Sequence, residues 1–271
     1  MSHSNDKIMV GRSEVSPPRI SRFFGRTLFV NLGSAEEKCC TWHCVYCPKE
    51  LEGEAGAGEI NKKLPHGDAE RLEAGADAKQ VIAAIRAGVA GGAELDSIVF
   101  TSTTEPTNHP MFAEIVSMTR DLRLTLGASW LLQSIGPGTQ LDEKKALEAY
   151  RLLDRFWVKL DCAIGELFES TLKPTHGETL QGYVAKLRSL GPLYIRVTLW
   201  RDLANKALQS WTPENLEKLL ALLVSLNPRL VHVSTLKNIA PTSNLRPVGD
   251  EDLDTFAMRL HEAGLDAEAF A

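Results

Sequence analysis

The chain has 271 residues, of which 44% are hydrophobic, and this is enough apolar material to fill the core of one large domain. A net charge of −5 and a pI of about 5.8 argue against a nucleic-acid partner, because such partners usually require a basic surface. No apolar run reaches the ~18 residues needed to span a membrane. No charged stretch followed by an apolar one opens the chain, so we expect a cytoplasmic protein with no membrane partner.

Strands and helices alternate along most of the chain. Residues 1–18 are polar, and we expect them to form a partly ordered arm ahead of a core domain of residues 19–271. Predicted strands cover residues 26–32, 96–102, 128–133, 156–161, 193–199 and 230–235. Predicted helices cover residues 78–90, 111–122, 141–153, 179–190, 213–226 and 250–263. This alternation predicts an α/β fold with parallel strands and right-handed crossovers.

Residues 49–76 interrupt the alternation. The segment is rich in Gly, Glu and Lys and has no hydrophobic periodicity. Loops of this length inside a compact domain are usually functional or disordered. Because the segment directly follows a group of cysteines, it is interpreted either as a lid over a binding site or as a surface insertion.

The cysteines Cys40, Cys44 and Cys47 have the spacing C-x₃-C-x₂-C, and Tyr46 precedes the last of them. A cubane iron–sulfur cluster is usually held by four cysteines, so three thiolates on one loop leave one iron open for another ligand. Cys39 lies outside this spacing, and we do not expect it to be a ligand.

A zinc knuckle that also uses His43 is the main alternative for these cysteines. Structural zinc sites usually consist of two spaced pairs of ligands, and the sequence has no second pair. The remaining cysteine, Cys162, is more than a hundred residues away. A disulfide framework is disfavoured because no secretory signal is present.

The segment of residues 40–47 resembles the cluster-binding loop of the radical S-adenosylmethionine (SAM) superfamily. The resemblance implies a partial (β/α)₆ TIM-like barrel that binds a [4Fe–4S] cluster and SAM. In that family, the open iron chelates SAM, and an electron from the cluster cleaves the sulfonium to give a 5′-deoxyadenosyl radical. The resemblance also implies an external electron donor of the flavodoxin or ferredoxin type.

Segments outside the cysteine loop extend the resemblance from about residue 19 to the C-terminal residue. Residues 21–28, 158–161 and 246–248 resemble segments of stand-alone radical SAM proteins that are related to the wyosine-base synthases. Glu105 and Pro106 match the end of the family's Gly-Gly-Glu-Pro segment, which binds the SAM amino group. Its two glycines are replaced here by Thr103 and Thr104, and threonine resists conformations that glycine allows.

Three predicted strands alternate polar with apolar residues, although strands of parallel sheets are usually apolar on both faces. Lys159 and Asp161 share one face of their strand, and Arg196 and His232 lie on the next two strands. Burial without partners is costly for such groups, so they either pair with one another or bind a polar ligand. We expect them to line the interior near the C-terminal ends of the strands.

The resemblance assigns roles to several residues. Tyr46 is expected near the SAM adenine, Ser134 near the ribose or carboxylate, and His232 near the ribose. Lys159 and Asp161 are expected to hold the carboxylate and ribose. The expected cofactor contacts are Tyr46, Thr103, Thr104, Glu105, Ser134, Lys159, Asp161, Arg196 and His232. No catalytic residue is singled out, and Cys162 is interpreted either as a hydrogen donor or as a small core residue.

The leading expectation is a radical SAM enzyme that acts on a small molecule, with the type of reaction left open. The first alternative is modification of a macromolecule, either a tRNA base or a glycyl-radical enzyme. The second is a non-catalytic Fe–S or SAM-binding protein, which the two threonines in place of glycines favour.

Overall fold

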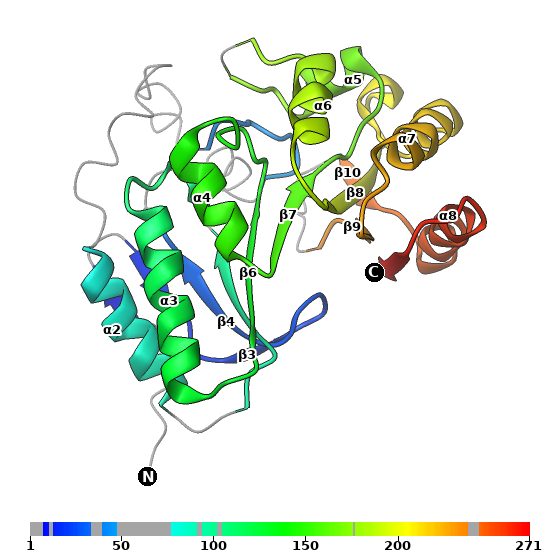
Figure 1. The fold of residues 1–271 in the computed structure, drawn as a ribbon. Coiled ribbons are helices and arrows are strands. Elements are labelled where there is room, and N and C mark those ends of the chain that lie inside the picture. Colours follow the sequence, from blue (N-terminus) through cyan, green and yellow to red (C-terminus); the bar gives the residue numbers. More distant parts are fainter. Residues whose placement is uncertain are drawn as a thin grey trace. The chain divides into compact units, whose positions relative to one another are not determined.

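The structure is a computed structural model that describes residues 8–10, 13–33, 40–47, 77–90, 94–101, 105–175, 177–237 and 244–271. It comprises two compact units (Figure 1). Unit 1 contains Met1–Thr41 and Ala69–Trp157, and unit 2 contains Trp42–Asp68 and Val158–Ala271. The predicted segment of residues 49–76 lies outside the described residues.

The sheet of unit 1 has the strand order β1-β2-β4-β5-β6, and β3 pairs with β4. Its strands are β1 (Ile8–Val10), β2 (Ser13–Val15), β3 (Arg19–Ser21), β4 (Gly25–Asn31), β5 (Ser97–Thr101) and β6 (Leu131–Gly136). β4, β5 and β6 are parallel, as the sequence predicted, and they correspond to its first three strands. β2 and β3 pair antiparallel with β4. Residues of the predicted N-terminal arm therefore contribute β1 and β2.

Three α-helices of unit 1 lie side by side (Figure 1). They are α2 (Ala78–Val89), α3 (Phe112–Leu126) and α4 (Lys144–Leu152), and a short 3₁₀ helix, η3 (Pro106–Asn108), precedes α3. α2 begins where the Asp77 side chain accepts a hydrogen bond from the backbone of Lys79. α3 ends at Gly127, whose φ of 59° is left-handed and favours glycine. Apolar side chains of α2 and α3 pack on β4 and β5 in one core.

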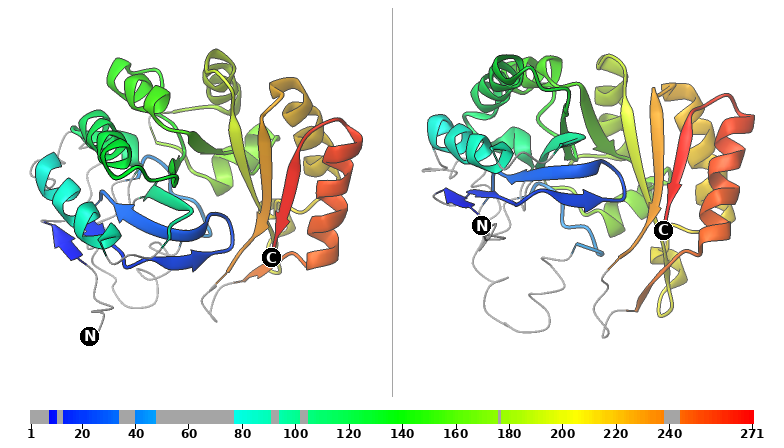
Figure 2. Two further views of the ribbon diagram at one scale, coloured as in Figure 1. Left: turned by 60° about the horizontal axis from the view of Figure 1, so that its bottom comes forward. Right: turned by 90° about the horizontal axis from the view of Figure 1, so that it is seen from below.

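The parallel strands of unit 2 follow the order β8-β9-β11, and β10 pairs antiparallel with β8. These strands are β8 (Tyr194–Asp202), β9 (Leu230–Thr235), β10 (Leu245–Pro247) and β11 (Ala267–Phe270). β7 (Arg155–Lys159) contains the boundary between the two units. The helices are α5 (Gly165–Thr171), α6 (Leu180–Ser189), η4 (Lys206–Leu208), α7 (Pro213–Leu226) and α8 (Asp250–Glu262). α8 packs against β9 and β11 (Figure 2).

Every predicted strand and helix is present. α7 and β9 have the predicted ends, and each of the other predicted elements is shifted at one or both ends. The sequence analysis missed β1, β2, β3, β10, β11 and α5. The missed strands have only three or four residues and α5 has seven, so none is long enough to show a hydrophobic period.

Within the described ranges, no helix is both long enough and apolar enough to cross a membrane.

Candidate functional site

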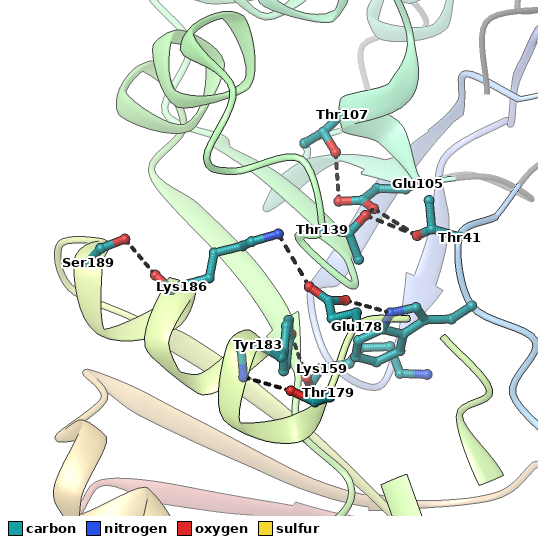
Figure 3. Close-up of polar contacts among 12 residues, drawn as sticks. Thr41, Glu105, Thr107, Thr139, Lys159, Glu178, Thr179, Tyr183, Lys186 and Ser189 are labelled. Atoms are coloured by element: carbon teal, nitrogen blue, oxygen red, sulfur yellow. Dashed lines mark hydrogen bonds and ion pairs between the residues drawn. The ribbon is translucent and has the colours of Figure 1, made fainter. Parts of the chain in front are cut away.

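The carboxylate of Glu105, which directly precedes η3, is surrounded by threonine hydroxyls of unit 1. Glu105 is completely buried, and its Oε1 accepts a hydrogen bond of 2.6 Å from the hydroxyl of Thr107 (Figure 3). Its Oε2 accepts hydrogen bonds from Thr139 and, at 3.3 Å, from Thr41. Burial raises the pKa of Glu105, while hydrogen bonds from Thr107, Thr139 and the backbone of Thr139 and Gln140 oppose that rise. The sequence analysis singled out Glu105 but missed the hydroxyls around it.

The other predicted contacts of unit 1 lie on β6 or outside the described residues. Ser134 is buried, and its hydroxyl donates to the carbonyl of Phe100 at 3.3 Å. This bond ties the side chain to the neighbouring strand β5. Thr103 and Thr104 fall outside the described residues.

No disulfide joins any cysteine in the described part of the chain, including the three of the motif. Cys40 and Cys47 are partly buried and Cys44 is buried. A turn closes the motif, since the N–H of Cys47 donates to the carbonyl of Cys44 at 2.9 Å. In the described ranges, no three His, Cys, Asp or Glu side chains are grouped to bind a single metal ion. In a cubane cluster the thiolates bind separate irons, so the residues of this loop fit that group by number and type.

Trp42 anchors the part of the cysteine loop that belongs to unit 2. Its ring is buried and packs edge-on against Phe168 and Tyr183, at centroid distances of 5.4 and 5.0 Å. The indole N–H donates to Glu178 at 3.3 Å, and Glu178 also pairs with Lys186 at 3.3 Å (Figure 3). An aromatic residue within a cysteine motif was the signal that could have identified this anchor.

Backbone hydrogen bonds join the same loop to the end of α5. The N–H of His43 donates to the carbonyl of Lys173 at 3.2 Å, and the N–H of Val45 donates to the carbonyl of Thr171 at 2.8 Å. The backbone around Cys44 is therefore held in place by its own unit, which favours a preorganised ligand loop.

Tyr46, Lys159 and Asp161 form one hydrogen-bonded group in unit 2. The Tyr46 hydroxyl donates to Oδ2 of Asp161 and accepts a 2.5 Å hydrogen bond from Nζ of Lys159. Nζ of Lys159 lies 3.8 Å from Oδ2 of Asp161, and Oδ1 accepts a 2.7 Å hydrogen bond from the N–H of Thr198. Burial raises the pKa of Tyr46 well above its usual value, and the charges of Asp161 and Cys44 add to this rise.

The predicted pairing of Lys159 with Asp161 is therefore present. Because Asp161 is completely buried, its charge depends on these donors for compensation. The sequence placed both residues on one face of the strand, and it placed Tyr46 near the cofactor, but it did not predict that Tyr46 bridges the pair.

Arg196 and His232 lie opposite each other on β8 and β9, as their register shows. His232 is buried, its Nε2 lies 3.4 Å from Oε2 of Glu268, and its ring centroid lies 4.7 Å from that of Phe270. Both neighbours belong to β11, a strand that the sequence analysis did not predict.

Cys162 is completely buried, and its Sγ lies 3.6 Å from the hydroxyl of Thr171. Burial raises the pKa of this thiol, and the neighbouring charge of Asp161 adds to the rise. A buried thiol of this kind is inert, which favours the interpretation of Cys162 as a core residue.

A cavity of about 480 Å³ lies in unit 1 between the starts of α3 and α4. Its lining includes Asn108, His109, Lys144 and Lys145 and none of the predicted cofactor contacts.

Comparisons with known proteins identify similar solved structures. No protein-family model and no curated protein matches the sequence. A radical SAM methyltransferase from Sphaerobacter thermophilus superposes with a TM-score of 0.59 and 17% identity, over 95% of this chain and 68% of that chain. TYW1 with a lysine-pyruvate adduct bound gives a TM-score of 0.60 and 12% identity, over 94% and 85%. Streptococcus suis SuiB bound to S-adenosylmethionine gives a TM-score of 0.54 and 13% identity, over 86% of this chain and 48% of that chain.

At these identities the likeness establishes the fold. The resemblance found in the cysteine loop and the architecture of nearly the whole chain agree, since both point to the same group of proteins. The chain shares the fold of these solved structures, which include a radical SAM methyltransferase.

Proposed function

We propose that this protein is a radical SAM enzyme that holds one [4Fe–4S] cluster through Cys40, Cys44 and Cys47. The observation that carries the proposal is the C-x₃-C-x₂-C set of thiols on an anchored loop, in a chain with the radical SAM fold. When bound, the cluster and SAM supply a carbon radical, while the protein's part is to bind, orient and shield.

The group formed by Tyr46, Lys159 and Asp161 supports a SAM site. The side chain of Lys159 is 19% exposed, so its ammonium can be reached by a carboxylate such as that of SAM. Lys159 is held in place by its hydrogen bond to Tyr46 and by its ion pair with Asp161, and Tyr46 also donates to Asp161. Ser134, Arg196 and His232, with Thr103 and Thr104, complete the proposed cofactor contacts.

A small molecule is the proposed substrate, with an external flavodoxin- or ferredoxin-type protein as electron donor. The net charge of −5 supports this choice over a nucleic acid. A peptide or protein substrate is the second candidate, because the similar structures include SuiB bound to the precursor peptide SuiA, with a TM-score of 0.55.

Anaerobic reconstitution with iron and sulfide tests the proposal. The protein is reduced with dithionite and mixed with SAM, and the products are identified by mass spectrometry. We expect 5′-deoxyadenosine from the wild type and none from Cys44→Ala, whereas Cys162→Ala keeps the activity because its thiol lies outside the motif. Methylthioadenosine instead indicates cleavage of a different sulfonium bond.

A wild-type protein that binds iron and SAM but does not cleave SAM with any reductant supports the non-catalytic alternative. RNA or a peptide that co-purifies with the active protein and is changed during turnover contradicts the small-molecule substrate.

A further inference from the structure

The carboxylate of Glu105 has all of its hydrogen-bonding capacity in use within unit 1. Three hydroxyls donate to it, from Thr41, Thr107 and Thr139. The backbone N–H groups of Thr139 and Gln140 donate as well. A carboxylate offers about four lone-pair sites, so the protein's own donors already fill it. An ammonium group of a ligand would have to displace donors that are already in place.

Close packing holds the side chain of Glu105 in this position. A Cβ atom added to Gly136 of β6 would lie 3.2 Å from Cδ of Pro106 and 3.6 Å from Cγ of Glu105. The backbone of β6 therefore lies directly against Glu105. Because Glu105 is completely buried, it has no open path along which to turn its carboxylate towards solvent.

The bond from Thr41 connects this carboxylate to the cysteine motif. Thr41 is buried and directly follows Cys40 in the chain. Its hydroxyl lies 3.3 Å from Oε2 of Glu105 and 3.0 Å from the hydroxyl of Thr139 (Figure 3). These contacts fix the backbone that carries Cys40, and a ligand that is held before the metal binds loses less conformational freedom on binding.

We propose that Glu105 is a positioning residue that orients Cys40 through Thr41, and that it does not bind the SAM amino group itself. This role rests on the proposed function, because it assumes that Cys40 holds iron. The family resemblance implied instead that Glu105 contacts the amino group of SAM. Two observations support the positioning role of Glu105: its side chain is buried, and protein groups already donate hydrogen bonds to its carboxylate.

The rate of iron release to a chelator tests this role in the reconstituted protein. Glu105→Gln replaces an acceptor oxygen with an amide that donates, and Thr41→Val removes the hydroxyl with little change of shape. We expect each variant to release iron about tenfold faster than the wild type, the change expected for the loss of a hydrogen bond to a charged group. The double variant is expected to match the single variants, because both remove the same contact.

Thr119→Val is the matched control. Thr119 is a buried threonine of α3 whose hydroxyl donates to the carbonyl of Ile115 at 2.7 Å, away from Glu105. Its iron release is expected to equal that of the wild type. Thr41→Ser keeps a hydroxyl at this position, so its iron release is expected to be as slow as that of the wild type. If Glu105→Gln does not fold, the comparison of Thr41→Val with Thr41→Ser still tests the contact.

Equilibrium dialysis against SAM, normalised to cluster content, separates positioning from direct contact. We expect Glu105→Gln and Thr41→Val to change the Kd for SAM to the same extent. A rise of the Kd in Glu105→Gln alone, additive effects on iron release, or unchanged release in Thr41→Val overturns the role. A wild-type protein that binds no cluster overturns the proposed function instead, and this role with it.

Discussion

Lys159 donates a 2.5 Å hydrogen bond from its ammonium group to the hydroxyl of Tyr46. The same hydroxyl of Tyr46 donates a hydrogen bond to the buried carboxylate of Asp161. A residue of the cysteine motif is thereby joined to the end of β7, and the ring of Tyr46 also lies 4.9 Å from that of Trp200. The cysteine loop and the polar face of a strand therefore form one cluster within unit 2.

Removing the bridging hydroxyl is expected to weaken this cluster. Tyr46→Phe deletes hydrogen bonds to two charged groups, and we expect the free energy of unfolding to fall by about 2 kcal/mol. Urea unfolding of the metal-free protein measures the change. Tyr183→Phe is the comparison, because the Tyr183 hydroxyl donates to a neutral carbonyl, that of Lys159, at 2.7 Å. Its cost is expected to be about 1 kcal/mol, and equal costs for the two variants would contradict the charged bridge.

Neutralising Asp161 is expected to be more damaging. Asp161→Asn removes the charge that compensates Lys159, whose side chain is only 19% exposed. Breaking a buried pair in this way costs about 3–5 kcal/mol. Glu214→Gln is the control, because Glu214 and Lys218 form an ion pair of 2.7 Å whose side chains are 68% and 53% exposed. Loss of this surface pair is expected to cost less than about 1 kcal/mol.

Stability is expected to fall in mild acid because of His109. Its side chain is buried, its Nδ1 accepts a hydrogen bond of 3.2 Å from the N–H of Met111, and burial lowers its pKa below 6.5. The unfolded chain therefore binds a proton at a higher pH than the folded protein does. The contribution of neutral His109 to the free energy of unfolding is fully present above pH 6.5, and it falls as the pH drops below that value.

Urea unfolding between neutral and mildly acidic pH measures this loss. His109→Gln keeps an acceptor for the backbone N–H but cannot be protonated, so its stability is expected to depend less on pH. Identical pH profiles for the two proteins would show that His109 does not titrate as its burial implies.

A glycine of α2 is expected to resist substitution. A Cβ atom at Gly88 would lie 2.5 Å from Cδ1 of Leu28, which is completely buried on β4. Alanine usually stabilises a helix relative to glycine by about 0.5–1 kcal/mol, but overpacking here is expected to cost about 1–3 kcal/mol. Gly165→Ala is the control, because nothing lies within 4 Å of the added atom. Thermal unfolding should therefore shift downward for Gly88→Ala and stay equal or rise for Gly165→Ala.

Local patterns explain why much of this protein could be predicted. The succession of strand-like and helical stretches predicted β4 to β9, because the two kinds of element have different hydrophobic patterns. Three of these strands alternate polar with apolar residues, and a side chain's face repeats every two residues in a strand. The same period placed Lys159 and Asp161 on one face, where the structure has them paired. The spacing of Cys40, Cys44 and Cys47, together with the family resemblance of their loop, predicted them as a set of ligands.

Contacts between distant segments explain what could not be predicted. Thr41 and Thr139 meet beside Glu105 although they lie 98 residues apart in the chain. His232 meets Glu268 because β11 pairs with β9, and a strand of four residues leaves no periodic signal. Hydrogen-bond partners of this kind depend on which strands become neighbours, and that choice is made by packing of the whole core.

The sequence by itself determined the α/β class and the order of the main strands and helices, and it predicted the cysteine set, because each depends on periodicity or spacing within a short stretch. Only the tertiary structure decided which groups satisfy the buried charges of Glu105 and Asp161. A buried carboxylate requires donors at fixed distances, and the chain supplies them from loops and strands that folding alone brings together.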